Sequence, residues 1–209
     1  MAVPHTSLET LMAKLAEVGL NSDELVLKAI EQAKKSHGST KRDDGFRNYL
    51  EQHIYPVTLS VIEYFQKVRL QLTPELVSGS LLHDALEDDP NLNEECFRQE
   101  FGEEVYRIVK PLTKPDYKTY PGKTKKERKF ALNEEYIKGI ESAVFESKLI
   151  KSADRLNNVQ CTQAGTKKEK LKFYIEETEK YYLPLIRGIS SHFYIQVMET
   201  VELLKSRIK

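Results

Sequence analysis

Apolar residues recur at the spacing of a helix through almost the whole chain, and this periodicity limits the fold more than any other feature of the sequence. From Ser7 to Gly19 they lie three or four positions apart, and the same spacing returns after Ser22. No stretch shows the sustained alternation of apolar and polar residues that is typical of a half-buried strand. The sequence therefore predicts an all-α protein.

Proline, glycine and capping residues divide this periodicity into helices joined by polar loops. The predicted helical segments are residues 7–18, 22–37, 46–65 with a bend or a new start at Pro56, 74–86, 93–101, 103–109, 127–145, 146–161, 167–182 and 184–209. A polar loop runs from Gly38 to Gly45, and residues 114–129 hold a candidate mobile flap and a basic run. We find no Gly/Ser/Pro-rich linker, so residues 1–209 are expected to form a single domain.

The amino-acid composition limits the kinds of partner that the chain is expected to bind. Lysine plus arginine and aspartate plus glutamate both number 32, so no overall positive field attracts nucleic acid or an anionic membrane. The only two cysteines, Cys96 and Cys161, suit a reducing compartment rather than a disulfide framework. No apolar run is long enough to span a bilayer. We therefore expect a soluble, cytoplasmic protein with no nucleic-acid or membrane partner; its oligomeric state is left unknown.

Five ionisable residues follow an apolar run in the stretch Leu81-Leu82-His83-Asp84-Ala85-Leu86-Glu87-Asp88-Asp89. In a continuous helix, His83 and Glu87 would share one face, and Asp84 and Asp88 the neighbouring face. A helix that simply ended in solvent would more often carry lysine or arginine in its last turn. An imidazole beside carboxylates at such a helix end indicates a bound divalent cation.

A second polar cluster borders an apolar stripe in Lys151-Ser152-Ala153-Asp154-Arg155-Leu156-Asn157-Asn158. Together with His53, which lies on an inward stripe, these clusters supply two imidazoles and two carboxylates, a suitable ligand set for a first-row divalent metal. The predicted ligands are His53, His83, Asp84 and Asp154. Glu87 and Asp88 lie one turn further on, where they can orient or deprotonate a metal-activated water. The pattern predicts metal-assisted hydrolysis of a phosphate ester or anhydride.

The spacing of these motifs resembles the HD superfamily of metal-dependent phosphohydrolases. In particular, His-Asp-x-x-Glu-Asp at 83–88 and Lys-x-Ala-Asp-Arg-Leu-x-Asn at 151–158 resemble the hydrolase domain of the RelA/SpoT family and its small stand-alone members. The resemblance covers roughly residues 25–165, with residues 167–209 expected to pack on that core. It implies an HD-type helical bundle that removes the 3′-pyrophosphate of (p)ppGpp using manganese, with iron or another divalent metal as the alternative.

The resemblance also implies roles for individual residues. The metal ligands would be the four named above, Glu87 and Asp88 would form the catalytic pair, and Asn158 would contact substrate or water. Phosphate contacts are expected from Lys41, Arg42, Arg47 and Lys151. His37 is left open between a residue of the site and a helix-end residue that binds nothing.

The segment before His53 departs from the family pattern Arg-Lys-x-Gly-x-Pro-Tyr-x-x-His-Pro. Here it reads Arg42-Asp43-Asp44-Gly45-Phe46-Arg47-Asn48-Tyr49-Leu50-Glu51-Gln52-His53. In the family this segment packs on the guanine base, so a phosphohydrolase acting on another nucleotide is the alternative function. A non-catalytic HD module, regulatory or binding, is the alternative of a different class.

Overall fold

The computed structural model describes residues 3–42, 45–162 and 166–208, so residues 43 and 44 of the predicted polar loop and residue 209 of the last predicted helix lie outside the described residues. The chain forms two compact units, an N-terminal unit that ends at Thr113 and a C-terminal unit that begins at Lys114. Every regular element of the described residues is helical, apart from one isolated bridge between Lys41 and Asn48. The prediction of an all-α fold is confirmed, whereas the assignment of residues 1–209 to a single domain stays a prediction.

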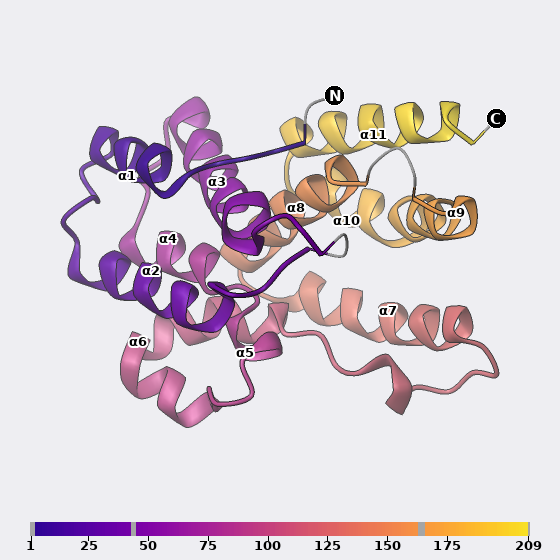
Figure 1. The fold of residues 1–209 in the computed structure, drawn as a ribbon, viewed down its shortest axis with the longest axis horizontal. Coiled ribbons are helices and arrows are strands. Elements are labelled where there is room, and N and C mark those ends of the chain that lie inside the picture. The colour runs from indigo at the N-terminus through magenta and orange to yellow at the C-terminus, as the bar shows by residue number, and fades with distance from the viewer. Residues whose placement is uncertain (1–2, 43–44, 163–165, 209) are drawn as a thin grey trace. The chain divides into compact units, whose positions relative to one another are not determined.

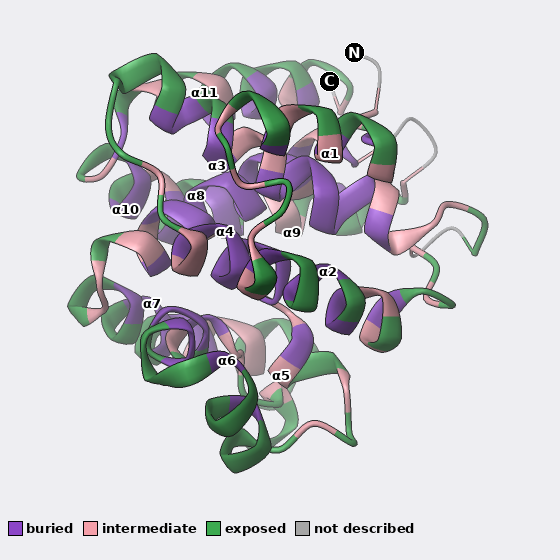
Figure 2. Cartoon of the chain, turned by 90° about the vertical axis from the view of Figure 1, so that its left-hand side faces the viewer, coloured by how far each residue is buried: buried purple, intermediate pink, exposed green. Residues whose placement is uncertain are grey.

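The N-terminal unit is built around a buried helix, α4. Its elements are α1 (Leu8–Glu17), α2 (Glu24–His37), the π-helical turn η1 (Leu50–Ile54), α3 (Tyr55–Val68), α4 (Pro74–Leu81), α5 (Ala85–Asp88), α6 (Glu94–Val109) and the 3₁₀ turn η2 (Lys110–Leu112). α4 packs against α2, α3 and α6, while α1 packs on α3 (Figure 1). Figure 2 shows the contrast between α4, which is largely buried, and the banded surface of α2, which buries one face only.

The helices of this unit begin where the sequence supplies a capping oxygen. The side chains of Ser7, Asp23, Thr73 and Asn93 each accept a backbone N–H from the first turn of the helix that follows. Gly102, at φ +83°, divides α6 into two helical parts, as the sequence predicted for residues 93–101 and 103–109.

Close contact between α4 and α6 depends on a glycine. A Cβ atom added at Gly79 would come within 2.6 Å of Cγ2 of Ile108 on α6. The two helices therefore approach more closely than any residue with a side chain at position 79 allows without a shift of its neighbours. This contact fixes the helix whose C-terminal end leads directly to His83.

The C-terminal unit contains the remaining helices. They are the 3₁₀ turn η3 (Tyr117–Thr119), α7 (Lys125–Ser142), α8 (Phe145–Gln160), α9 (Lys168–Glu177), the π-helical turn η4 (Thr178–Tyr182), α10 (Leu183–Arg187) and α11 (Ser191–Ser206). α11 packs against α8, α9 and α10, and α7 contacts α8 and η4. One predicted boundary is wrong: residues 184–209 do not form one helix, because the chain turns at Gly188–Ser190 and Ser190 caps α11 by accepting the N–H of Phe193.

A buried ion-pair network stabilises this unit. The Arg155 guanidinium donates to Glu177 at 2.9 Å, to Oγ1 of Thr178 and to the carbonyl of Tyr174, and it stacks on the Tyr182 ring 4.1 Å away. These contacts join α8 to α9 and η4. Among the described residues, no helix combines the length and the apolar character needed to cross a membrane.

Candidate metal centre

Three of the predicted ligands converge in the N-terminal unit. The Nε2 atoms of His53 and His83 lie 3.3 Å apart, and Oδ2 of Asp84 lies 3.2 Å from the first and 3.3 Å from the second. Both imidazoles are buried, and the Asp84 side chain is 16 % exposed. One ligand atom from each residue thus lies within 4.8 Å of the others, as they would around a single cation.

His83 and Asp84 lie in a break between helices. The continuous helix predicted for residues 74–86 is wrong, because α4 ends at Leu81 and the chain makes a turn before α5 begins at Ala85. In that turn Nδ1 of His83 lies 2.7 Å from the carbonyl oxygen of Ser80, so Nδ1 carries the proton and Nε2 offers its lone pair to the site. The turn brings both residues to one point, which neighbouring positions of a straight helix would not do.

His53 comes from the π-helical turn η1, in which the N–H of Tyr55 bonds to the carbonyl of Leu50 five residues earlier. The family pattern has two residues between its tyrosine and its histidine, whereas three separate Tyr49 from His53 here. A π-helical turn holds more residues than an α-helical turn, and it accommodates the longer spacing.

Tyr49 is a site residue that the sequence reasoning missed, because it was assigned only to an apolar stripe. Its hydroxyl donates a 2.7 Å hydrogen bond to Oδ2 of Asp84, and its ring lies 5.0 Å from that of His53. The signal in the sequence was its position about one helical turn before the predicted ligand His53.

The charge on Asp84 is maintained by its neighbours. Burial alone would raise the pKa of this carboxyl, but the His83 and His53 imidazoles, through charge and hydrogen bonding, hold the pKa well below its ordinary value. Asp84 is therefore ionised at neutral pH. An anionic oxygen between two imidazoles forms a site with the donor types that bind a first-row divalent cation.

The predicted catalytic pair lies just beyond, on α5. Glu87 and Asp88 are both exposed at the surface of this four-residue helix. Partial burial, and then the negative charges of Asp84 and Glu87, raise the pKa of Asp88 to about 7. A carboxyl group that titrates near neutral pH is suited to exchange a proton with water.

Three predicted phosphate contacts lie on the loop between α2 and η1. The N–H of Arg42 bonds to the carbonyl of Arg47, and the backbone of Lys41 forms its bridge with Asn48, so the loop folds back on itself. The Arg42 guanidinium lies 5.4 Å from the ring centroid of Tyr49. The loop thus joins α2 directly to the tyrosine that holds Asp84.

Asp154, Asn158 and Lys151 lie on α8 of the C-terminal unit. Oδ2 of Asp154 pairs with Nζ of Lys151 at 2.7 Å, and Oδ1 accepts a 2.5 Å hydrogen bond from Nδ2 of Asn158. Burial would lower the pKa of Lys151, but the charge of Asp154 holds it well above its ordinary value. The fourth predicted ligand is thus oriented by the two predicted substrate contacts of its own helix.

The residues of the N-terminal unit fit a divalent metal on their own chemistry. Both Nε2 atoms are available as ligands because Nδ1 of His83 is occupied by a carbonyl and His53 directs its own Nε2 at Asp84. Mixed imidazole and carboxylate ligands of this kind suit a first-row divalent metal.

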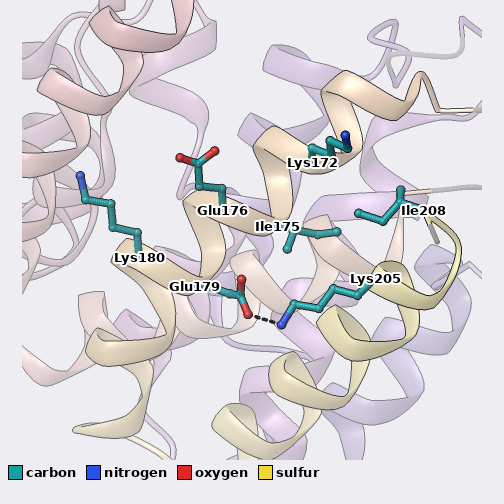
Figure 3. A pocket seen from close by; sticks show the side chains of 7 residues that line it. All are labelled: Lys172, Ile175, Glu176, Glu179, Lys180, Lys205 and Ile208. Carbon is teal, nitrogen blue, oxygen red and sulfur yellow. Dashed lines mark ion pairs between the residues drawn. The ribbon is translucent and has the colours of Figure 1, made fainter.

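A surface groove in the C-terminal unit is separate from all predicted site residues. It has a volume of about 480 Å³ and is lined by Ile175 and Ile208 together with charged side chains, among which Lys205 pairs with Glu179 at 2.5 Å (Figure 3). It lies between α9, η4 and α11. It contributes none of the ligands discussed above.

The fold and the site define a class of proteins: all-α proteins in which a His-Asp pair and a distant histidine form a divalent-metal centre. Residues 29–188 match the family described as HD domain, and this chain belongs to that family. The features on which the sequence analysis based the resemblance all lie within this match.

Several proteins similar to this chain carry names that refer to the hydrolysis of (p)ppGpp. The chain is 33 % identical over 188 residues to a guanosine-3′,5′-bis(diphosphate) 3′-pyrophosphohydrolase of Aquifex aeolicus, covering 83 % of this chain and 24 % of the relative. It is 28 % identical over 163 residues to the bifunctional (p)ppGpp synthase/hydrolase SpoT of Escherichia coli K12, covering 77 % of this chain and 21 % of the relative. The chain therefore spans about a quarter of the length of these relatives.

The fold is also similar to a solved structure of a metazoan ortholog of SpoT, described as hydrolysing ppGpp and playing a role in starvation responses. The TM-score is 0.67 at 21 % sequence identity, with 87 % of this chain and 96 % of that chain covered. At this identity the likeness establishes the fold.

Proposed function

We propose that this chain is a metal-dependent phosphohydrolase that removes the 3′-pyrophosphate of (p)ppGpp. The observation that carries the proposal is the convergence of His53, His83 and Asp84 next to the acidic pair Glu87 and Asp88, in a chain of the HD domain family. Relatives named as 3′-pyrophosphohydrolases support this choice of substrate.

In this proposal His53, His83 and Asp84 hold the metal, and Asp154 is a fourth ligand. The assignment of Asp154 rests on its sequence motif, and its two oxygens keep lone pairs beyond those used by Lys151 and Asn158. When bound, the metal supplies Lewis acidity and a lowered pKa for water. Manganese is the metal we propose, with iron as the alternative, because of the ligand types.

Glu87 and Asp88 are assigned to the attacking water. Asp88 takes a proton from the water as its oxygen bonds to the phosphorus attached to the ribose 3′-oxygen. The bond between that phosphorus and the 3′-oxygen then breaks, the 3′-oxygen acquires a proton, and pyrophosphate leaves with the oxygen of the water. Glu87 keeps the neighbouring field negative, which favours a proton on Asp88.

Cationic side chains are assigned to the phosphates. Lys41, Arg42 and Arg47 come from the loop before η1, and Lys151 comes from α8, with Asn158 assigned to a substrate or water contact. Neither cysteine forms a disulfide among the described residues, which agrees with the reducing cytoplasm that we propose as the location.

The test is hydrolysis by the purified protein loaded with manganese. We expect release of pyrophosphate and guanosine 5′-diphosphate from ppGpp, lost on removal of the metal with a chelator. The variant Asp84→Ala should lose both manganese binding and turnover. Manganese binding with no turnover of any nucleotide would favour a non-catalytic HD module instead.

One observation favours a second candidate, a phosphohydrolase for another nucleotide. The segment expected to pack on the base lacks the family's Pro-Tyr pair, because Asn48 precedes Tyr49, and its Phe46 is 86 % exposed. Discrimination between bases needs polar groups matched to the base edge, and these residues differ in type. Assays with ppGpp, pppGpp, pppApp, NADPH and deoxynucleotides separate the candidates: turnover of another nucleotide, with no pyrophosphate from either guanosine compound, would support the second.

A further inference from the structure

His37, the last residue of α2, is a buried imidazole that the proposed mechanism does not use. Its side chain has no exposed surface, and neither ring nitrogen has a hydrogen-bond partner among the described residues. A buried polar group without a partner carries a free-energy cost, because the hydrogen bonds that it makes with water are lost and not replaced. An apolar residue would avoid this cost, so the presence of histidine at this position calls for a reason other than packing.

A carboxylate of the proposed catalytic pair lies close to this ring. Nδ1 of His37 lies 3.8 Å from Oδ2 of Asp88, just beyond hydrogen-bond distance. The ring itself is held in place, because it lies 5.2 Å from the ring of Tyr49, whose hydroxyl is bonded to Asp84. The Asp88 side chain is 42 % exposed, so much of its surface is not packed against other residues.

Other residues at the end of α2 already hold the short helix that carries Asp88. The hydroxyl of Ser36 donates to Oδ2 of Asp89 at 2.9 Å, and Gln32 donates to Ser36 at 2.9 Å and to Asp89 at 3.4 Å. A four-residue helix is not stable without such tertiary contacts. The last turns of α2 therefore determine where α5 lies, and His37 extends the same set of contacts to the next carboxyl group.

The protonation state of His37 is compatible with this contact. Burial lowers the pKa of its imidazole to about 4, and the neighbouring imidazoles of His83 and His53 add to this effect against the opposing charge of Asp84. The ring is therefore neutral at pH 7, with one nitrogen as a donor and the other as an acceptor. A neutral N–H donor can orient a carboxylate without neutralising it.

We propose that His37 is a positioning residue, which donates from Nδ1 to one oxygen of Asp88 and so directs the other oxygen toward the attacking water. The inference rests on the proposed role of Asp88. It assigns the end of α2 to the orientation of the catalytic pair, in addition to its place in the core of the N-terminal unit.

The test compares two substitutions of the same residue. His37→Phe keeps a ring of similar size against Tyr49 but removes both nitrogens, whereas His37→Gln keeps a side-chain donor. We expect His37→Phe to lower kcat by about 10- to 100-fold, the range seen when a supporting contact of a site is lost, with KM and manganese affinity unchanged. His37→Gln should recover most of that loss, and His192→Phe on α11 is the matched control.

A measurement independent of turnover uses the imidazole ¹⁵N resonances of the metal-free protein. The Nδ1 resonance of His37 should move in Asp88→Asn and stay in place in Asp89→Asn. Equal activities of His37→Phe and wild type, or equal losses in the two His37 variants, would overturn the proposal, as would an Nδ1 resonance indifferent to Asp88→Asn. Full turnover by Asp88→Asn would instead refute the proposed function of the acidic pair, a result that the resonance shift does not depend on.

Discussion

Asp84 and Asp154 are the two carboxylates of the HD-type motifs, and their surroundings differ in charge. Asp84 lies between two imidazoles and a tyrosine hydroxyl, with no lysine or arginine in contact with it in any described interaction. Asp154 is paired with Lys151, and one residue further along, Arg155 is paired with Glu177. The N-terminal unit concentrates acid at its site, whereas the C-terminal unit pairs its buried charges internally.

Buried charge therefore has a different effect in each of the two units. In the C-terminal unit the buried carboxylates of Asp154 and Glu177 are each paired with a cation of the chain, and the Arg155 contacts link α8 to α9. In the N-terminal unit, partial burial and then the charges of Asp84 and Glu87 raise the pKa of Asp88. The excess of acid at 84, 87 and 88 leaves an attractive site for an external cation. Buried charge is paired within the chain in the C-terminal unit, whereas at the site of the N-terminal unit acid is left available to an external cation.

The largest effect expected from this comparison is on turnover. The double variant Glu87→Gln/Asp88→Asn should lower turnover by about 10³-fold, because no carboxylate remains to accept the proton of the water. Its manganese affinity, measured by titration, should equal that of wild type. Glu103→Gln/Glu104→Gln on α6 is the matched control, and unchanged turnover in the first variant would remove the role of the pair.

The next largest effect should be on the stability of the C-terminal unit. Arg155→Met leaves the buried carboxylate of Glu177 without its main cation and should lower the free energy of unfolding by about 3–5 kcal/mol. Urea denaturation measures this. Lys126→Met removes an exposed ion pair with Glu176 and should cost no more than about 1 kcal/mol. Similar losses in both variants would contradict the view that buried pairs stabilise this unit.

A smaller loss is expected in the N-terminal unit, where packing rather than ion pairing joins α4 to α6. Gly79→Ala places a methyl group 2.6 Å from Ile108 and should lower the free energy of unfolding by about 1–3 kcal/mol, independently of salt concentration. The loss in Arg155→Met should respond to salt more strongly. If Gly79→Ala left the free energy of unfolding unchanged, this would show that α4 and α6 can move apart without a loss of stability.

The smallest effect concerns pH. Because the pKa of Asp88 is raised to about 7 in the folded, metal-free protein, the folded state binds a proton there that the unfolded chain releases near pH 4. Its contribution to stability is therefore full below pH 4 and is lost as the pH rises to 7. Asp88→Asn should gain stability relative to wild type over this range, by no more than about 1 kcal/mol because the side chain is partly exposed. A pH-independent difference between the two proteins would be evidence against the raised pKa.

Sequence reasoning was most successful where the pattern was local and repeated. Helical periodicity predicted the fold class, and a capping residue such as Thr73, just before the predicted segment 74–86, marked where a helix begins. It failed at the break before Ala85 and at the turn before Ser191, where tertiary contacts and caps override a continuous apolar pattern. Leucine at 81, 82 and 86 fits one helix as well as two.

The site was predictable in its residue types but not in its supporting contacts. His53, His83 and Asp84 could be grouped from their chemistry and motif, and the structure brings them together. The hydrogen bonds of Tyr49 and Ser36 to Asp84 and Asp89 join residues about 35 and 53 positions apart in sequence, and no local periodicity encodes such pairs. The roles of Asp154 and of the cationic loop stay predictions.

The π-helical turn before α3 has a consequence for how this protein tolerates changes in chain length. Its five residues hold the ring of His53 against Tyr49 even though the spacing between them exceeds that of the family pattern. Deleting one residue, Glu51, is expected to convert the turn to α-helix and to preserve both ends, since a π-helical hydrogen bond spans one residue more than an α-helical one. The spacing of such motifs along the chain can therefore drift by one residue while the distances between their side chains stay fixed.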